Sequence, residues 1–163
     1  MLPLLVALPA AFAGVCQLLR SPLAVLRMCV AGVAFLVLPA GAAVFMVFRH
    51  GAIFAAGKWL MLDALSAFHV TVLMIVFAIS AFFAVGYFRG EIDRGEFTLK
   101  HARRYGSLWL GALAAMMLVL VSNNLGVMWV GIESTTLLTA FLICIHVTPG
   151  ALEAMWKYLM MCS

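Results

Sequence analysis

The chain has 163 residues, of which 67% are hydrophobic and only 10% are charged, and its mean hydropathy is +1.19. A soluble domain carries about 25% charged residues, so this composition excludes an ordinary soluble globule and predicts a surface solvated mainly by the lipid bilayer. Inside a bilayer, backbone polar groups must bond within the protein, and the absence of period-two alternation excludes a barrel. The predicted fold class is an all-α integral membrane protein.

Six apolar segments follow one another along the chain, separated by short polar or proline-containing turns. Five are long enough to cross a bilayer, whereas Ala151–Ser163 reaches only about 20 Å, short of a hydrocarbon core about 30 Å thick. We therefore expect five complete transmembrane helices and a truncated sixth, in a single membrane domain over 1–163 that is the N-terminal part of a larger subunit. The expected helices cover approximately 1–20, 23–48, 60–88, 105–121, 125–145 and 150–163.

The basic residues predict an orientation. No Lys or Arg precedes the first apolar segment, so we interpret it as a retained helix and not as a cleaved signal peptide. The positive-inside rule places the more basic side in the cytoplasm and the N-terminus outside. The more basic side has Arg20, Arg27, the five basic residues of 89–104 and Lys157, against Arg49 and Lys58 on the other. Because the net charge of +4 sits in such loops, it predicts no nucleic-acid partner.

The sequence contains no motif of a self-contained enzyme. It has no Gly-rich phosphate loop, no His-Glu-x-x-His and no Cys-x-x-Cys. Each cysteine lies in an apolar run, where a thiol behaves as a small hydrophobe, which argues against an iron–sulfur cluster or a structural zinc. We expect neither a metal nor another cofactor. The cysteines are Cys16, Cys29, Cys144 and Cys162.

Glu133 is the most informative ionisable residue, because it lies near the middle of the expected helix 125–145. A charged side chain at that depth costs about 2.5–3.5 kcal/mol to insert, so we expect it to face protein or water. Gly126, Val130, Thr136 and Ala140 lie three or seven residues away on one mostly small stripe, which would let another helix approach. Burial favours the protonated carboxyl and a nearby cation favours the carboxylate, as a reversible proton site requires. A hydrogen-bonded packing residue is the alternative.

Glu153 and Lys157 lie four residues apart, in the order that favours an ion pair on one face of a helix. Lys157 is either a lysine whose charge reaches toward the membrane surface, or a cation that tunes Glu133 or holds a proton itself.

His69 lies about one and a half turns after Asp63 on the expected third helix. An intramembrane histidine is either a satisfied packing residue or a member of a proton relay. Asp63 lies at the start of that helix, where the helix dipole favours a negative charge.

Three segments resemble the antiporter-like, proton-translocating membrane subunits of respiratory complex I, and most closely those of hydrogenase-4-type membrane-bound hydrogenases (component F). The segments are Asp63–Phe68, Ser122–Leu137 with its Trp-Val-Gly-Ile-Glu block, and Ala151–Tyr158 with Glu-Ala-Met-Trp-Lys-Tyr. The resemblance implies that Glu133 is central to a proton channel and that Lys157 is a supporting cation. It also implies redox centres in partner subunits, and later broken helices bearing further ionisable groups that this chain does not reach.

From this resemblance we predict an incomplete proton-translocating, non-redox membrane subunit of an oxidoreductase complex, either NADH:quinone oxidoreductase-like or hydrogenase-like. Its expected location is the bacterial plasma (inner) membrane, and its expected partners are lipid, other membrane subunits and protons. The predicted site consists of Glu133, Lys157, Glu153 and His69. Two alternatives remain: a monovalent cation/proton antiporter subunit of the same superfamily, and a non-catalytic scaffold or gene fragment.

Overall fold

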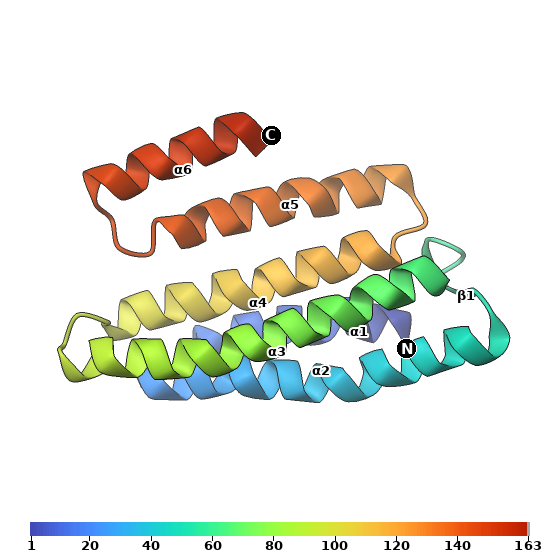
Figure 1. Ribbon diagram of the computed structural model, residues 1–163, viewed down its shortest axis with the longest axis horizontal. Helices are drawn as coiled ribbons and strands as arrows, with labels where there is room; N and C mark the ends of the chain where they lie inside the picture. Colours follow the sequence, from blue (N-terminus) through green and yellow to red (C-terminus); the bar gives the residue numbers. More distant parts are fainter. Residues whose placement is uncertain (163) are drawn as a thin grey trace.

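The computed structural model describes residues 1–162, which form six helices and one two-stranded hairpin, with the helices lying roughly parallel to the long axis (Figure 1). The elements are α1 (Leu2–Cys16), α2 (Pro22–His50), β1 (Ile53–Ala55), β2 (Leu60–Leu62), α3 (Ala64–Asp93), α4 (Leu99–Val121), α5 (Leu125–Ile143) and α6 (Pro149–Cys162).

Local sequence signals set where three of the helices begin. The Asp63 carboxylate accepts the Ser66 N–H at 2.7 Å before α3, and the Thr98 hydroxyl accepts the His101 N–H at 3.4 Å before α4. Asn124 caps α5 by accepting two backbone N–H groups. Such side chains satisfy helix N–H groups that have no partner within the helix.

The segment before α3 corrects the predicted boundaries. The predicted third helix included residues 60–62, but these form β2, which pairs antiparallel with β1. Gly57 and its neighbours Ala56 and Lys58 all have positive φ, which turns the chain back on itself. Asn123, in the α4–α5 connection, donates its backbone N–H to the Trp59 carbonyl at 2.8 Å and so holds this hairpin in place.

Two other predicted boundaries are also wrong. The predicted third helix ended at 88, whereas α3 continues to Asp93, and the predicted fourth helix began at 105, whereas α4 begins at Leu99. Polar residues near helix ends leave the hydrocarbon without leaving the helix, because only the apolar part of a helix is matched to membrane thickness. Most of the predicted polar connection is therefore helical.

The helices form a main bundle with an outer helical hairpin. Helices α1 to α4 surround the main apolar core, which includes Leu36, Val70 and Leu113. Helix α5 lies on α4, and α6 lies on α5 with a small cluster of its own, made of Ala140, Cys144 and Met155 (Figure 1). The α5–α6 hairpin is therefore attached to the bundle mainly through one face of α5.

Two glycines lie where helices pack closely against each other. A Cβ on Gly106 of α4 would lie 2.6 Å from Val25 Cγ1, and one on Gly131 of α5 would lie 2.7 Å from Val119 Cγ2. Both distances are shorter than normal carbon contacts, so these positions allow α4 to approach α2 and α5 to approach α4.

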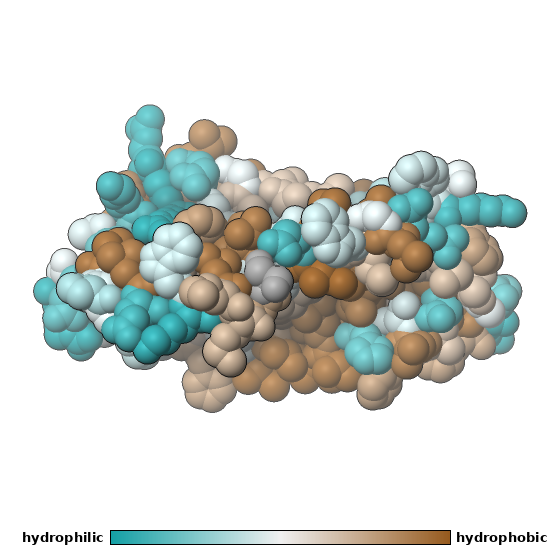
Figure 2. Space-filling view, turned by 90° about the horizontal axis from the view of Figure 1, so that it is seen from above, coloured by the Kyte–Doolittle hydropathy of each residue, from teal (hydrophilic) through white to brown (hydrophobic). Residues whose placement is uncertain are grey.

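Within residues 1–162, four helices are long and apolar enough to cross a membrane: α2, α3, α4 and α5. Helix α1 is apolar but has only 15 residues, and α6 has 14, so the predicted count of five complete spans is not confirmed. Apolar residues occupy much of the middle of the molecule, and hydrophilic residues gather mainly toward its two ends (Figure 2). This distribution matches a bundle that crosses a bilayer along its long axis.

Candidate functional site

Glu133 lies where the sequence places it along the helix. It is eight residues after Leu125 and ten before Ile143, near the middle of α5, and its side chain is half-buried. Ala140, two turns further along α5, packs with Met155 of α6. Because residues seven apart share a helix face, Glu133 lies on the side of α5 that also contacts α6.

The predicted stripe of small residues around Glu133 is only partly correct. Thr136 and Ala140 are buried, but Gly126 is exposed at the cap and Val130 is 51% exposed. The close approach of α4 to α5 instead uses Gly131. Residues three or four positions apart both lie on one face of a helix, so a residue can be assigned to either of two adjacent faces. The sequence alone does not tell which of these faces of α5 meets α4.

Glu153 and Lys157 form the predicted ion pair. Their Oε1 and Nζ atoms are 2.6 Å apart, one turn from each other on α6. Both side chains are largely exposed, at 66% for Glu153 and 70% for Lys157. The pair therefore lies on an outer face of α6, and an effect of Lys157 on Glu133 stays a prediction.

A hydroxyl contact joins the two helices of the outer hairpin. Thr139 Oγ1 of α5 and Tyr158 OH of α6 are 2.9 Å apart, and Tyr158 directly follows Lys157. Other hydroxyls on α5 donate to backbone carbonyls one turn earlier, so they add polarity without leaving unmet donors. These hydroxyls belong to Ser134, Thr135 and Thr136.

His69 lies on α3, at the edge of a groove of about 530 Å³ formed by α3, α4 and α5. Its Nδ1 bonds to the Leu65 carbonyl at 2.8 Å, and the ring is exposed. Thr135 and Thr136 line the opposite wall of the groove, while Glu133 is not among its lining residues. The structure thus brings His69 near the hydroxyls of α5, and membership of a relay stays a prediction.

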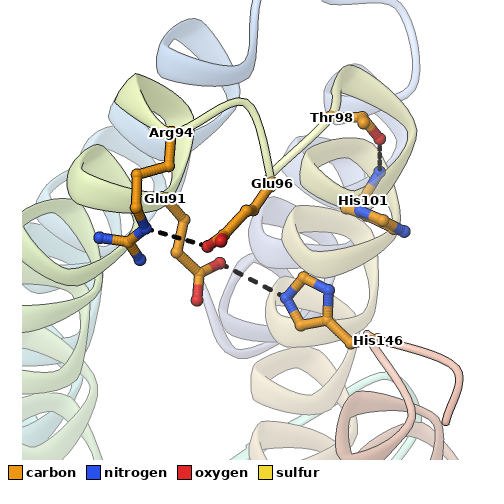
Figure 3. A network of polar contacts seen from close by, with 6 residues as sticks. All are labelled: Glu91, Arg94, Glu96, Thr98, His101 and His146. Atoms are coloured by element: carbon orange, nitrogen blue, oxygen red, sulfur yellow. Dashed lines mark hydrogen bonds and ion pairs between the residues drawn. The ribbon is translucent and has the colours of Figure 1, made fainter.

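The structure reveals a second ionisable cluster, which sequence reasoning missed, at the end of the bundle that contains the α3–α4 connection (Figure 3). Glu91 near the end of α3 is buried, and its Oε2 lies 3.4 Å from Nε2 of His146 in the α5–α6 connection. The ring of His101 on α4 lies 5.1 Å from that of His146. The end of α3 and the start of α4 are neighbours in the sequence, but His146 follows His101 by 45 positions, counted as 146 minus 101. The one sequence signal was a glutamate three residues after Phe88, which would have been noticed if α3 had been predicted to continue past 88.

Among residues 1–162, no three His, Cys, Asp or Glu side chains are close enough together to hold a metal ion. Independently of that, carboxylates, imidazoles and amines are side chains that can gain and lose protons.

The fold and these side chains define a multi-pass α-helical membrane protein with an acidic residue inside one span. No family model matches the chain. Over 102 residues, or 63% of the chain, it is 35% identical to the hydrogenase-4 component F homolog of Methylacidiphilum infernorum (isolate V4). This match covers 21% of the relative, so the chain spans about a fifth of the length of the curated protein it matches. The similarity supports the family that the sequence motifs indicate.

Proposed function

We propose that the chain acts within a proton-translocating membrane subunit of a complex I-like or hydrogenase-4-like assembly. The observation that carries the proposal is Glu133, a half-buried carboxyl near the middle of an apolar helix, in a chain similar to a hydrogenase-4 component. An acidic group at that depth is costly and is usually retained for ion or proton pathways.

Glu133 would be the group that exchanges the proton. It lies on the side of α5 that meets α6, the helix that bears Glu153 and Lys157. A positive charge near a half-buried carboxyl favours the carboxylate, and its withdrawal favours the protonated acid. In this proposal the charges of the exposed Glu153–Lys157 pair, on the helix that meets this side of α5, influence how tightly Glu133 holds its proton.

The site is tested by Glu133→Gln in the membrane complex that contains this chain. In inverted vesicles, proton uptake driven by electron transfer should fall about tenfold or more, because glutamine holds no exchangeable proton of this kind. Electron transfer and assembly should remain. Glu96→Gln is the matched control, since Glu96 is exposed in the α3–α4 connection and should change nothing.

Two outcomes of that experiment would reject the proposal. If an assembled Glu133→Gln complex pumps normally, Glu133 is a packing residue and the chain is a scaffold. If vesicles without an electron donor exchange sodium for protons, and Glu133→Gln abolishes the exchange, the chain belongs to a cation/proton antiporter instead.

We further propose that α1 is a fifth crossing and that the N-terminus lies outside a bacterial plasma membrane. Helix α1 contacts β2 at one end of the bundle. At the other end, Arg103 Nε of α4 donates to the Leu19 carbonyl at 2.8 Å, just after α1. The segment 1–20 therefore runs the length of α4 although its regular helix has only 15 residues.

A further inference from the structure

Glu91, His101 and His146 come from three different elements. Glu91 lies on the last turn of α3, His101 on the first turn of α4, and His146 between α5 and α6. Glu91 and His146 point toward one another across the space between α3 and the outer hairpin (Figure 3). Two backbone hydrogen bonds hold the main chain at Glu91 in place, because its carbonyl accepts the N–H groups of Glu96 and Phe97 at 3.0 and 3.3 Å.

The Glu91 carboxylate is so deeply buried that its charge needs a nearby partner. Its side chain is 10% exposed, and within residues 1–162 its Oε2 has no hydrogen bond that meets normal geometry. Nε2 of His146 lies 3.4 Å from this oxygen, and the imidazole is positively charged only when it is protonated. Leaving a buried carboxylate without a positive charge is costly, so the pairing stabilises the fold most when His146 is protonated.

Among the other charged groups, Arg94 interacts electrostatically with Glu91 but forms its ion pair with Glu96. Arg94 on the same helix end donates Nε to Glu96 at 3.0 Å, and both of those side chains are exposed. Tyr87, one turn earlier on α3, is close enough to interact with Glu91 but is not a cation. His101 on α4 has a buried Nδ1 without a hydrogen bond among residues 1–162, and its ring meets that of His146.

The contact lies where the outer hairpin has few other attachments. The hairpin has a separate apolar cluster, and its connection to the main bundle passes through α4. The Glu91–His146 contact adds a link from the tip of this hairpin to α3. His146 is 42% exposed, so water can deliver a proton to the imidazole while the carboxylate behind it stays dry.

We propose that Glu91 and His146 form a proton-binding latch that ties the α5–α6 connection to α3. In the closed latch, His146 takes one proton from water and becomes an imidazolium beside the Glu91 carboxylate, so that the pair is neutral. Loss of that proton to water leaves one buried negative charge and weakens the link. The His101 ring, whose centre is 5.1 Å from that of His146, packs beside this pair and is not part of it. The latch does not require translocation through Glu133.

Hydrogen exchange of the full chain in lipid nanodiscs tests the latch. After correction for intrinsic exchange, protection of the Cys144 and Ile145 amides, which donate to the Leu142 carbonyl, should rise about tenfold between pH 8.5 and pH 5.5, the range over which imidazoles gain charge. Glu91→Gln and His146→Gln should each abolish this rise. Glu96→Gln, which removes an exposed carboxylate in the neighbouring connection, should keep it.

Two further variants separate the latch from the fold and from the proposed function. His101→Phe keeps a ring against His146 and should keep the rise, which shows that the region is folded. Glu133→Gln should also keep it, so failure of proton pumping leaves the latch untouched. Equal protection at both pH values in the unmodified chain, or an undiminished rise in both Glu91→Gln and His146→Gln, overturns the proposal.

Discussion

Gly106 of α4 allows the closest helix contact among the glycines of residues 1–162. A methyl group there would meet Val25 Cγ1 at 2.6 Å and Cys16 Sγ at 3.0 Å, so it would push α4 away from both α1 and α2. Neither neighbour is the flexible end of a long side chain. The main bundle is therefore sensitive to a single carbon at this position.

We predict that Gly106→Ala lowers the free energy of unfolding by about 1–3 kcal/mol, the usual cost of an overpacked core. Denaturant titration in detergent micelles, followed by circular dichroism, measures the change. Gly41→Ala in α2 is the control, because a Cβ there meets nothing within 4 Å. Equal stability of Gly106→Ala and Gly41→Ala would contradict the tight packing.

Asp63 links pH to the stability of α3. The Ser66 N–H that it accepts lowers the pKa of the Asp63 carboxyl below its ordinary value. A lowered folded-state pKa stabilises the fold above the unfolded value of about 3.9 and ceases to do so as pH falls through the folded-state value.

We therefore predict that Asp63→Ala lowers the free energy of unfolding by about 0.5–2 kcal/mol at pH 7, as loss of an N-cap does. Asp63→Asn keeps the accepting oxygen and should retain most of this stability, while it removes the dependence on pH below about 5. Unfolding curves of the three proteins at pH 3 to 7 measure both effects. A pH dependence that survives in Asp63→Asn would assign it to another carboxyl.

At the scale of elements, the outer hairpin depends on few contacts between α5 and α6. Its apolar cluster contains only Ala140, Cys144 and Met155 as buried members among the described residues. The hydrogen bond between Thr139 and Tyr158 is thus a large part of what fixes α6 against α5.

We predict that Tyr158→Phe lowers the local stability of α6 by about 0.5–1.5 kcal/mol, the net value of one hydrogen bond. Hydrogen exchange of the amides of 152–161 should speed up, while that of α2 stays unchanged. Glu153→Gln should have a smaller effect, since an exposed ion pair contributes little. The reverse order of the two variants would show that the ion pair, not the hydroxyl contact, holds α6.

The elements also show what sequence can and cannot predict here. The length of the apolar segments was enough to predict the four long spans, because the ability of a helix to cross a membrane depends on its length and composition. It missed the β1–β2 hairpin, since residues 60–62 are apolar and their strand depends on a turn and on Asn123 from elsewhere. It also ended α3 at 88, where the polar residues begin, and so lost Glu91 as a helix residue.

The ionisable residues likewise include one contact that the sequence predicts and one that it does not. Spacing of four residues was enough to predict the Glu153–Lys157 pair, because both residues belong to one helix. The Glu91–His146 contact joins residues 55 positions apart, counted as 146 minus 91, and depends on how α5 packs on α4. Local periodicity has no information about such a contact.

At the scale of the whole molecule, the helices place the β1–β2 hairpin and the α3–α4 connection at opposite ends of the bundle (Figure 1). Phe54 is exposed in β1, and Glu96 is exposed beside Arg94. If the long axis crosses the membrane, these two positions face different compartments. By the positive-inside rule, the excess of basic residues between 89 and 104 predicts that Glu96 faces the cytoplasm.

We predict that a membrane-impermeant maleimide labels Phe54→Cys, but not Glu96→Cys, in intact cells, and labels them in the opposite way in inverted vesicles. Both substitutions are made on Cys162→Ser, because Cys162 is the exposed native cysteine of residues 1–162 and the other three are buried. Labelling of both positions from one side would mean that α2 and α3 do not place them across a bilayer. Reversed labelling would keep the spans but invert the orientation, which would place the Glu91–His146 latch outside the cell and expose it to the external pH.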